Sequence, residues 1–249
     1  MPSYSSFASF YDRLTQNVGY EQRAREYIEI LAQNGINSGI LLDLACGTGS
    51  FTEHFCRSGF DVIGVDASPE MLCEAQAKLS SQEPPPLLLC QLMQNLDLYG
   101  TVDAAVCALD SINHLPSLSD VRKTFSRLSL FVRPGGIFIF DANTIYKHRE
   151  ILGNNTFVYD LDDIYCVWQN TLLDDTVSVG IDIDIFARES GQKYARYCEA
   201  FTETAYTPEE LECALCDNGF EVLSICGENT RSAPVEDTQR MIITAKHKT

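Results

Sequence analysis

The sequence predicts an α/β fold built around an open, doubly wound parallel sheet. From residue 39 to residue 142, short apolar runs rich in β-forming residues alternate with helical patterns. Strands separated by helices pair in parallel through right-handed crossovers. Between residues 157 and 206 the hydrophobic period becomes two, which is typical of antiparallel strands. A chain of 249 residues is long enough for one such domain with a smaller insertion.

Five short apolar runs are the expected strands of the parallel sheet, at 39–45, 60–66, 86–91, 102–108 and 135–142. Helices are expected between them at 50–57, 69–80 and 117–132, and the residues before 36 also have a helical pattern. Ser68 precedes a proline at a first helical position, which is a clear start signal. The segment Arg133-Pro134-Gly135-Gly136 ends one helix and leads into the next strand.

After residue 150 the pattern predicts a small antiparallel layer and then a return to the main sheet. Alternating runs joined by Asp174-Asp175 and Glu189-Ser190-Gly191 predict a meander of three or four strands. A capping box at Thr207 and Glu210 starts a helix over 207–218, and two final strands are expected at 220–227 and 239–247. The expected plan is a main domain of residues 1–150 and 207–249, an inserted β layer of residues 151–206, and a helical N-terminal cover.

Composition and charge restrict the partners. The formal net charge is −17 at pH 7, so nucleic acid and anionic membranes would be repelled, whereas a small cationic substrate is tolerated. No apolar run approaches the ~20 residues of a membrane span, and the N-terminus lacks the pattern of a secretory signal. Several cysteines lie in apolar runs, which predicts reduced thiols and a cytoplasmic protein. No metal site is expected, because Cys213 and Cys216 lack a second pair of ligands.

A glycine-rich loop follows the first expected strand. In open parallel sheets ligands bind beyond the carboxyl ends of the strands, and Ala45, Gly47 and Gly49 let the main chain approach a ligand there. A dinucleotide site would need a third glycine where this chain has Thr52. The stretch DLACGTG instead begins with Asp43, whose carboxylate is unfavourable beside a pyrophosphate and favourable beside an ammonium or sulfonium group.

Asp66 ends the second expected strand. A carboxylate at this place can accept hydrogen bonds from both ribose hydroxyls, and it would repel the 2′-phosphate of NADP. Acids also commonly cap strand ends, but the spacing from the Asp43 loop favours a nucleoside site. We therefore expect Asp43 and Asp66 to bracket one cleft that accepts a positively charged sulfur nucleoside.

Three stretches carry a resemblance to a known family: LLDLACGTGSFTEHFCRSGFDVIGVDASPEMLCEAQAK, GTVDAAVCALDSINHL and LFVRPGGIFIFDANT. They resemble the nucleotide-binding half of the class I S-adenosylmethionine-dependent methyltransferases. The N-terminal segment and the β insertion resemble a subgroup that acts on small molecules, including amino-sugar and amine N-methyltransferases. The resemblance implies a Rossmann-like sheet of seven strands with the last one antiparallel.

The resemblance also implies which positions hold S-adenosylmethionine and its product S-adenosylhomocysteine. Asp66 would hold the ribose, and Tyr20, with Arg23, would reach the methionine carboxylate, with Tyr11 as a second candidate. The other implied positions are Ala45, Cys46 and Gly47 at the methionine part, Ala67, Met71, Leu92 and Met93 around the adenine, and Leu109 and Asp110 facing the sulfonium. Leu92 departs from the family pattern, because relatives often have an acid there that accepts from the adenine amino group. Adenine recognition must then use the backbone, Gln91 or Gln94, or be weaker.

Methyl transfer from a sulfonium depends mainly on alignment, but a protonated amine must also lose its proton. Asp110, His114 and Tyr11 are the candidate bases, because the stretch ALDSINHL is expected to form the pocket floor. Asp110 and His114 could instead serve a local turn or helix cap. His148 is a candidate for the pocket mouth.

The leading hypothesis is a methyltransferase that acts on a small-molecule acceptor, with nitrogen favoured over oxygen. An NAD-dependent oxidoreductase and a non-catalytic cofactor-binding module are the alternatives. The sequence predicts neither the acceptor nor the oligomeric state.

Overall fold

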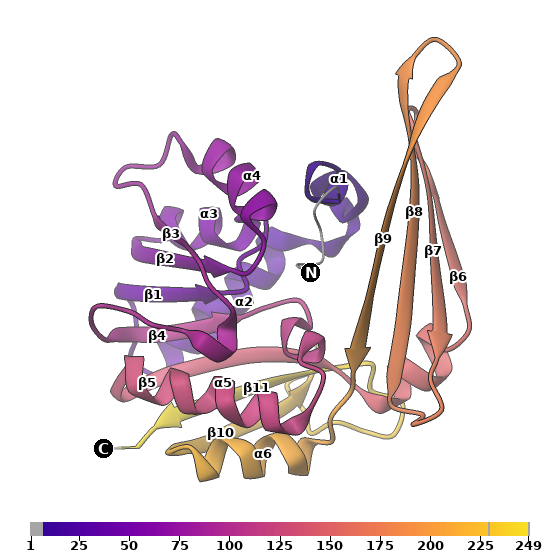
Figure 1. Ribbon diagram of the computed structural model, residues 1–249. Coiled ribbons are helices and arrows are strands. Elements are labelled where there is room, and N and C mark those ends of the chain that lie inside the picture. Colours follow the sequence, from indigo (N-terminus) through magenta and orange to yellow (C-terminus); the bar gives the residue numbers. More distant parts are fainter. Residues whose placement is uncertain (1–6, 229, 249) are drawn as a thin grey trace.

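The computed structural model describes residues 7–228 and 230–248, which form two separate sheets (Figure 1). The larger sheet has seven strands in the order β10-β11-β5-β4-β1-β2-β3. Strand β11 runs antiparallel to both of its neighbours, and the central strands are parallel. This is the Rossmann-like arrangement that the sequence predicts. Its strands are β1 (Gly39–Leu44), β2 (Phe60–Asp66), β3 (Leu87–Cys90), β4 (Val102–Cys107), β5 (Val132–Asn143), β10 (Phe220–Gly227) and β11 (Arg240–His247).

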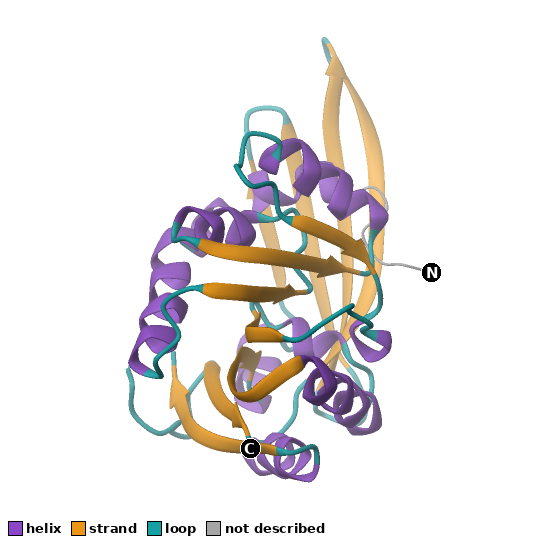
Figure 2. Ribbon diagram, turned by 90° about the vertical axis from the view of Figure 1, so that its left-hand side faces the viewer, coloured by secondary structure: helices purple, strands orange, loops and turns teal. Residues whose placement is uncertain are grey.

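Helices flank both faces of the larger sheet (Figure 2). On one face, α2 (Tyr20–Gln33) and α3 (Ser50–Arg57) pack on Ile137 and Ile139 of β5. On the other face, α5 (Leu118–Phe131) and α6 (Pro208–Asp217) pack on Phe138 and Phe140. Alternate side chains of β5 are therefore buried on opposite faces, as expected for a central strand covered by helices on both faces. Strand β5 begins three residues earlier than expected, because Val132 already pairs with β4 ahead of an irregularity in the register.

The expected helix start signals form as local structures. Ser68 caps α4 (Pro69–Leu79) by accepting a hydrogen bond from the Met71 amide. Thr207 and Glu210 form the reciprocal capping box at the start of α6. Four short helical turns complete the chain: η1 (Gln16–Val18), η2 (Met93–Asn95), η3 (Ser111–His114) and η4 (Lys147–Leu152).

The second sheet is an antiparallel meander of four strands in chain order: β6 (Thr156–Asp160), β7 (Ile164–Leu172), β8 (Ser178–Ser190) and β9 (Lys193–Thr204). The alternation in β8 separates two faces, since Ile181, Ile183 and Ile185 are buried while Asp182 is exposed. The buried face packs against Phe7 at the start of α1 (Ala8–Leu14).

Helix α1 lies between α4 and the four-stranded sheet (Figure 1). It is tied to the glycine-rich loop through Asp12, which accepts a hydrogen bond from Thr48 Oγ1 at 2.5 Å. The other oxygen of Asp12 lies 2.6 Å from Lys78 Nζ on α4. Lys78 also donates to Ser50 Oγ at 2.7 Å. The N-terminal cover is thus fixed over the end of β1 where the predicted site begins.

All ten cysteines are free thiols. No helix within residues 7–228 and 230–248 is long and apolar enough to cross a bilayer. The same residues contain no cluster of three or more metal-ligating side chains.

Candidate functional site

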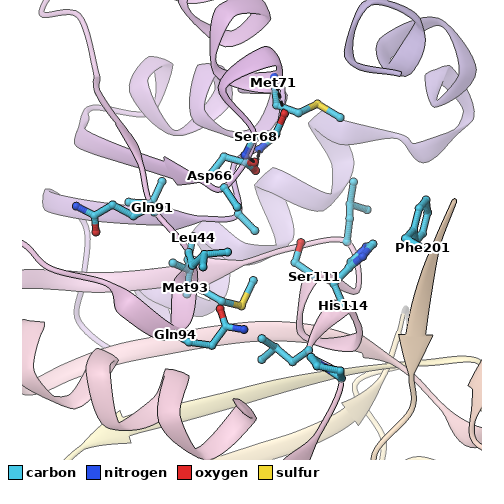
Figure 3. A pocket seen from close by; sticks show the side chains of 18 of the residues that line it. Leu44, Asp66, Ser68, Met71, Gln91, Met93, Gln94, Ser111, His114 and Phe201 are labelled. Atoms are coloured by element: carbon cyan, nitrogen blue, oxygen red, sulfur yellow. Dashed lines mark hydrogen bonds between the residues drawn. The ribbon is translucent and has the colours of Figure 1, made fainter. Parts of the chain in front are cut away.

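A cavity of about 440 Å³ opens at the carboxyl ends of β1, β2 and β4, a size typical of small-molecule sites (Figure 3). It extends from the segment that follows β3 to the short turn η3, and Phe201 of β9 also lines it. Most of the sequence-predicted site residues line it, namely Tyr11, Ala45, Gly47, Asp66, Ala67, Met71, Leu92, Met93, Leu109 and His114.

The two glycines of the loop do different things. Gly47 lines the cavity, and a Cβ added there would meet nothing within 4 Å. Gly49 does not line it; a Cβ there would lie 2.8 Å from Leu79 Cδ1 and 3.1 Å from Ala75 Cβ on α4. Both glycines have positive φ, at 54° and 76°, which disfavours any L side chain. The absence of a side chain at Gly47 therefore leaves room for a ligand to approach the backbone, whereas the absence of one at Gly49 allows α4 to pack closely.

Asp66 is a rigid acceptor in the cavity wall. Its Oδ2 accepts from the Gly47 amide at 2.8 Å, and its Oδ1 accepts from the Ser68 amide at 2.8 Å. Burial raises the pKa of Asp66, and the amides of Ser68 and Gly47 oppose that shift. The carboxylate is thus held between the glycine loop and the start of α4, where the sequence predicts it.

Asp43 does not bracket the cavity, which corrects the expectation from the sequence. It is 1% exposed, and its Oδ2 accepts from Thr52 Oγ1 of α3 at 2.5 Å. Burial raises the pKa of Asp43 to about 7, against the opposing hydrogen bond from Thr52. The side chain points behind the loop toward α3, and its strand neighbour Leu44 lines the cavity instead.

A smaller cavity of about 40 Å³ shares Tyr11, Ala45 and Gly47 with the larger one. Tyr20 and Cys46 line this smaller cavity, and the Tyr20 hydroxyl hydrogen-bonds Thr15 Oγ1 at 2.9 Å. Burial raises the pKa of Tyr20.

Arg23 lines neither cavity, contrary to the expectation that it joins Tyr20 there. Its Nε donates to the Val18 carbonyl at 2.9 Å, and its guanidinium pairs with Glu228. The pairing with Glu228 turns the side chain of Arg23 away from the glycine loop.

The segment after β3 forms the far end of the cavity. Leu92 lines it and is 52% exposed. The side-chain amide of Gln91 is engaged by Asp97, accepting from the Asp97 amide at 2.9 Å and donating to the Asp97 carbonyl at 3.0 Å. Gln94 also lines the cavity, in the short turn η2.

The turn after β4 has an unusual backbone that a buried carboxylate holds. Leu109 and Asp110 have φ of 53° and 51°. Asp141 of β5 accepts both of their amides, at 2.8 Å and 2.7 Å, and also pairs with Arg240. Tyr27 donates its hydroxyl hydrogen to the same carboxylate. The turn thereby places Leu109 in the cavity wall.

Asp110 does not line either cavity, so the expectation that it forms the pocket floor is not met. Its carboxylate lies 2.9 Å from Arg240 Nη1 and accepts from Asn143. Burial alone would raise the pKa of Asp110, but Arg240, Lys147 and His114 outweigh it and hold the pKa below its usual value. A carboxylate so committed to Arg240 is a poor proton acceptor.

His114 lies at the opposite end of the cavity from Gln91, beside Phe201 (Figure 3). Its ring centroid is 5.1 Å from that of Phe201, which projects from β9. Its Nε2 lies 3.7 Å from Glu203 Oε1. Tyr11, the third candidate base, lines the cavity from α1.

Phe201 and Glu203 are not predicted at this end of the cavity from the sequence. Both lie on one face of β9, in register with Ile181 and Val179 of β8. Period-two alternation reveals such a face but does not reveal that it turns toward η3. His148, expected at the pocket mouth, is instead fully buried and does not line the cavity.

The chain is similar in sequence and in structure to methyltransferases. A family model described as a methyltransferase domain matches residues 41–136. YqeM of Bacillus subtilis (strain 168), which is named as a methyltransferase, is 33% identical over 243 residues, covering 98% of this chain and 96% of YqeM. The crystal structure of an S-adenosylmethionine-dependent methyltransferase from Clostridium acetobutylicum ATCC 824 is 35% identical with a TM-score of 0.88, covering 99% of each chain. A glycine/sarcosine N-methyltransferase of Parasynechococcus marenigrum (strain WH8102) is 27% identical over 204 residues, covering 79% of this chain and 65% of that protein.

Proposed function

The chain belongs to the S-adenosylmethionine-dependent methyltransferases, and from that premise we propose that it methylates the nitrogen of a small amine. Family membership removes the NAD-dependent oxidoreductase and the non-catalytic module as alternatives. The observation that carries the proposal is one cavity lined both by the fixed carboxylate of Asp66 and by His114, with the buried carboxylate of Glu203 3.7 Å from the His114 ring.

The residues present fit S-adenosylmethionine. Asp66 has both oxygens fixed by backbone amides and would accept from the ribose hydroxyls. Met71 and Met93 are apolar lining residues that would flank the adenine. Gln94 is the lining amide that would meet the adenine edge, because Gln91 is held by Asp97 and Leu92 has no polar group. Gly47 would allow close approach of the methionine part to the loop.

When bound, S-adenosylmethionine supplies a methyl carbon on a positively charged sulfur, and the carbon–sulfur electron pair stays with the sulfur to give S-adenosylhomocysteine. The protein's task is therefore alignment and exclusion of water. Leu109 and Phe201 contribute apolar surface to the cavity lining, and Tyr11 of α1 lines the same cavity.

The cavity as a whole favours a cation, because the charged group in its lining is the carboxylate of Asp66. At the acceptor end the nearby negative charge is the buried carboxylate of Glu203, 3.7 Å from His114 Nε2. An ammonium group would be drawn to this end, and it must lose a proton before its nitrogen can attack. We assign His114 to accept that proton and Tyr11 to hold the acceptor. Glycine/sarcosine N-methyltransferase activity in a relative supports an amine as the substrate class.

Matched pairs of acceptors test the proposal. Purified protein is incubated with S-adenosylmethionine and either an amine or the hydroxy compound of the same skeleton, for example glycine and glycolate, or ethanolamine and ethylene glycol. Release of S-adenosylhomocysteine is measured. The proposal expects release with one or more amines and none with their hydroxy partners. Release with the hydroxy partners and none with any amine would overturn the nitrogen assignment while leaving the family intact.

A further inference from the structure

A buried glutamate lies between two histidines at the acceptor end. Glu203 of β9 is 5% exposed, and its Oε1 is 3.7 Å from Nε2 of His114. Its Oε2 is 3.7 Å from Nε2 of His148 on η4, which is fully buried. His114 lines the cavity and His148 does not. A chain of three ionisable side chains thus runs from the cavity into the protein, through elements far apart in sequence.

The surroundings of His148 fix where its hydrogens lie. Its Nδ1 is 2.7 Å from the Val177 carbonyl oxygen, which can only accept, so Nδ1 carries a hydrogen. Its Nε2 is buried and has no hydrogen-bond partner within the described part of the chain. If Nε2 carried no hydrogen, its lone pair would face the negatively charged Oε2 of Glu203, and these two buried acceptors would repel each other. A proton on Nε2 replaces this repulsion with an ion pair.

Charge balance around Glu203 points the same way. Three carboxylates, the buried Asp141 and Glu203 and the half-buried Asp110, face two cations, Arg240 and Lys147. Glu228 also approaches Arg240, and its charge is balanced by its pairing with Arg23. Burial and the nearby Arg240 lower the pKa of Lys147, so the surroundings already disfavour the charged form of this second cation. One further positive charge beside Glu203 makes the set neutral, and buried charges persist only when they are compensated.

The amide of Asn143 joins the two parts of this cluster. Its Nδ2 donates to Glu203 Oε2 at 3.3 Å, and its Oδ1 accepts from Lys147 Nζ at 2.8 Å. Glu203 is thereby held in place from β5 as well as from η3 and η4. This fixed placement is what a residue needs in order to orient a neighbouring imidazole.

We propose that Glu203 forms a buried ion pair with a doubly protonated His148, and that Glu203 is the positioning residue that orients His114 and stabilises its protonated form. The second half rests on the proposed function, in which His114 accepts the proton of an ammonium acceptor. The nitrogen–hydrogen bond of the acceptor breaks, its electron pair stays on nitrogen to attack the methyl carbon, and the proton moves to His114. Glu203 then faces two imidazolium rings, and the proton on His114 leaves to solvent after the product.

Other charged groups act on the same side chains. Asp66 and Asp110 act electrostatically on His114, Lys147 acts on Glu203, and Asp175 acts on His148. Lys147 is the one of these groups that responds to Glu203→Gln, because Glu203 helps to raise the pKa of Lys147. A loss of charge on Lys147 would favour protonation of the histidines, so a fall in their protonation in Glu203→Gln reports on Glu203 itself.

Histidine ¹⁵N NMR on the whole protein, without cofactor or acceptor, tests the proposal. The chain has four histidines, so each resonance can be assigned by removing one histidine at a time. We expect both ring nitrogens of His148 to carry hydrogens at pH 7 in the natural protein, and Nδ1 alone to carry one in Glu203→Gln. A singly protonated His148 in the natural protein would overturn the ion pair.

Two variants with opposite expected effects test the role of Glu203 toward His114. At a pH where His114 is partly protonated, the protonated fraction is expected to fall by about threefold or more in Glu203→Gln, because the nearby negative charge is lost. The fraction is expected to rise in His148→Gln, because Glu203 then has one positive partner fewer. Equal or same-sign changes in the two variants would show a merely structural role and refute the proposal.

Controls separate this inference from the proposed function. Asp184→Asn, on the opposite face of the four-stranded sheet where Asp184 pairs with Arg196, is expected to leave both histidines unchanged. Calorimetric titration with S-adenosylhomocysteine verifies that each variant is folded. If Glu203→Gln does not fold, Glu203→Asp and His148→Gln are measured instead. Glu203→Asp keeps the negative charge, so His148 is expected to stay doubly protonated in that variant, and a singly protonated His148 there would overturn the ion pair. Failure to detect methyl transfer would bear on the proposed function alone, since the NMR measurement uses no substrate.

Discussion

The Gly47 amide donates to Asp66 Oδ2 at 2.8 Å, so the loop after β1 and the end of β2 form one unit in the cavity wall. The Ser68 amide fixes the second oxygen of Asp66 in the same way. The carboxylate therefore needs no rearrangement to accept hydrogen bonds from a ligand, which is the advantage of a preorganised site.

Replacing Asp66 by Ala removes this acceptor. We expect the affinity for S-adenosylhomocysteine to fall by roughly tenfold to a hundredfold, because losing hydrogen bonds to a charged group costs about 1.5–3 kcal/mol. Isothermal titration calorimetry measures it. Asp61→Ala is the matched control, because Asp61 is an exposed acid on the same strand. Unchanged affinity in Asp66→Ala would remove Asp66 from the cofactor site.

The two loop glycines should respond differently to the same substitution. Gly49→Ala places a Cβ 2.8 Å from Leu79 at a φ of 76°, so we expect a loss of stability of about 2 kcal/mol or more. Gly47→Ala places its Cβ in open space, so it should cost about 1 kcal/mol of stability from backbone strain and weaken cofactor binding. Thermal unfolding and calorimetry distinguish the two. Equal losses of stability with equal affinity in both variants would contradict the division of roles.

Ionisation of Asp43 should lower the free energy of unfolding as the pH rises. Burial raises its pKa to about 7 in the folded protein, above the value of 3.8 expected in the unfolded chain. The folded state then binds this proton more tightly, so the contribution is fully present below pH 4 and is lost as the pH rises toward 7. Asp43→Asn keeps an acceptor for Thr52 and removes the titration.

Urea unfolding between pH 4 and pH 8 checks this expectation. Relative to the natural protein, the Asn variant should gain stability with increasing pH up to about pH 7, by up to about 1.4 kcal/mol for each pH unit, and then stay level. A stability difference that is independent of pH would show that Asp43 titrates normally.

Substitutions of His114 and Asp110 should affect different properties, turnover in the first case and stability in the second. His114→Asn is expected to lower the turnover of an amine acceptor by about a hundredfold or more, the usual contribution of a general base, while S-adenosylhomocysteine still binds. Asp110→Asn removes one of the carboxylates that pair with the buried Arg240, and we expect it to lose about 3 kcal/mol of stability. Steady-state kinetics and chemical unfolding give the two readouts. A stable Asp110→Asn protein without turnover would restore Asp110 as the base.

The elements of the fold could be predicted because their signals are local. The proline after Ser68, the capping box at Thr207 and the alternation around Ile183 each depend on neighbouring residues, and each produced the expected element. The glycine loop and Asp66 were predictable for the same reason, since consecutive strand ends of a parallel sheet share one edge.

The parts of the site that could not be predicted depend on distant partners. Asp110 follows β4 as expected, but Arg240, which is 130 positions away, pairs with its carboxylate. Asp43 lies one residue before the end of β1, and the alternation of the strand turns it toward Thr52 rather than the cavity. Glu203 meets His148 only because the second sheet closes against η4.

The most direct test of the account follows the methyl carbon itself. S-adenosylmethionine labelled with ¹³C in the methyl group is incubated with the protein and the matched amine and hydroxy acceptors, and the product is examined by ¹³C NMR. We predict a methyl resonance on nitrogen that is strongly reduced in His114→Asn although this variant still binds S-adenosylhomocysteine. A methyl resonance on oxygen, or equal nitrogen methylation by the His114 variant, would contradict the account.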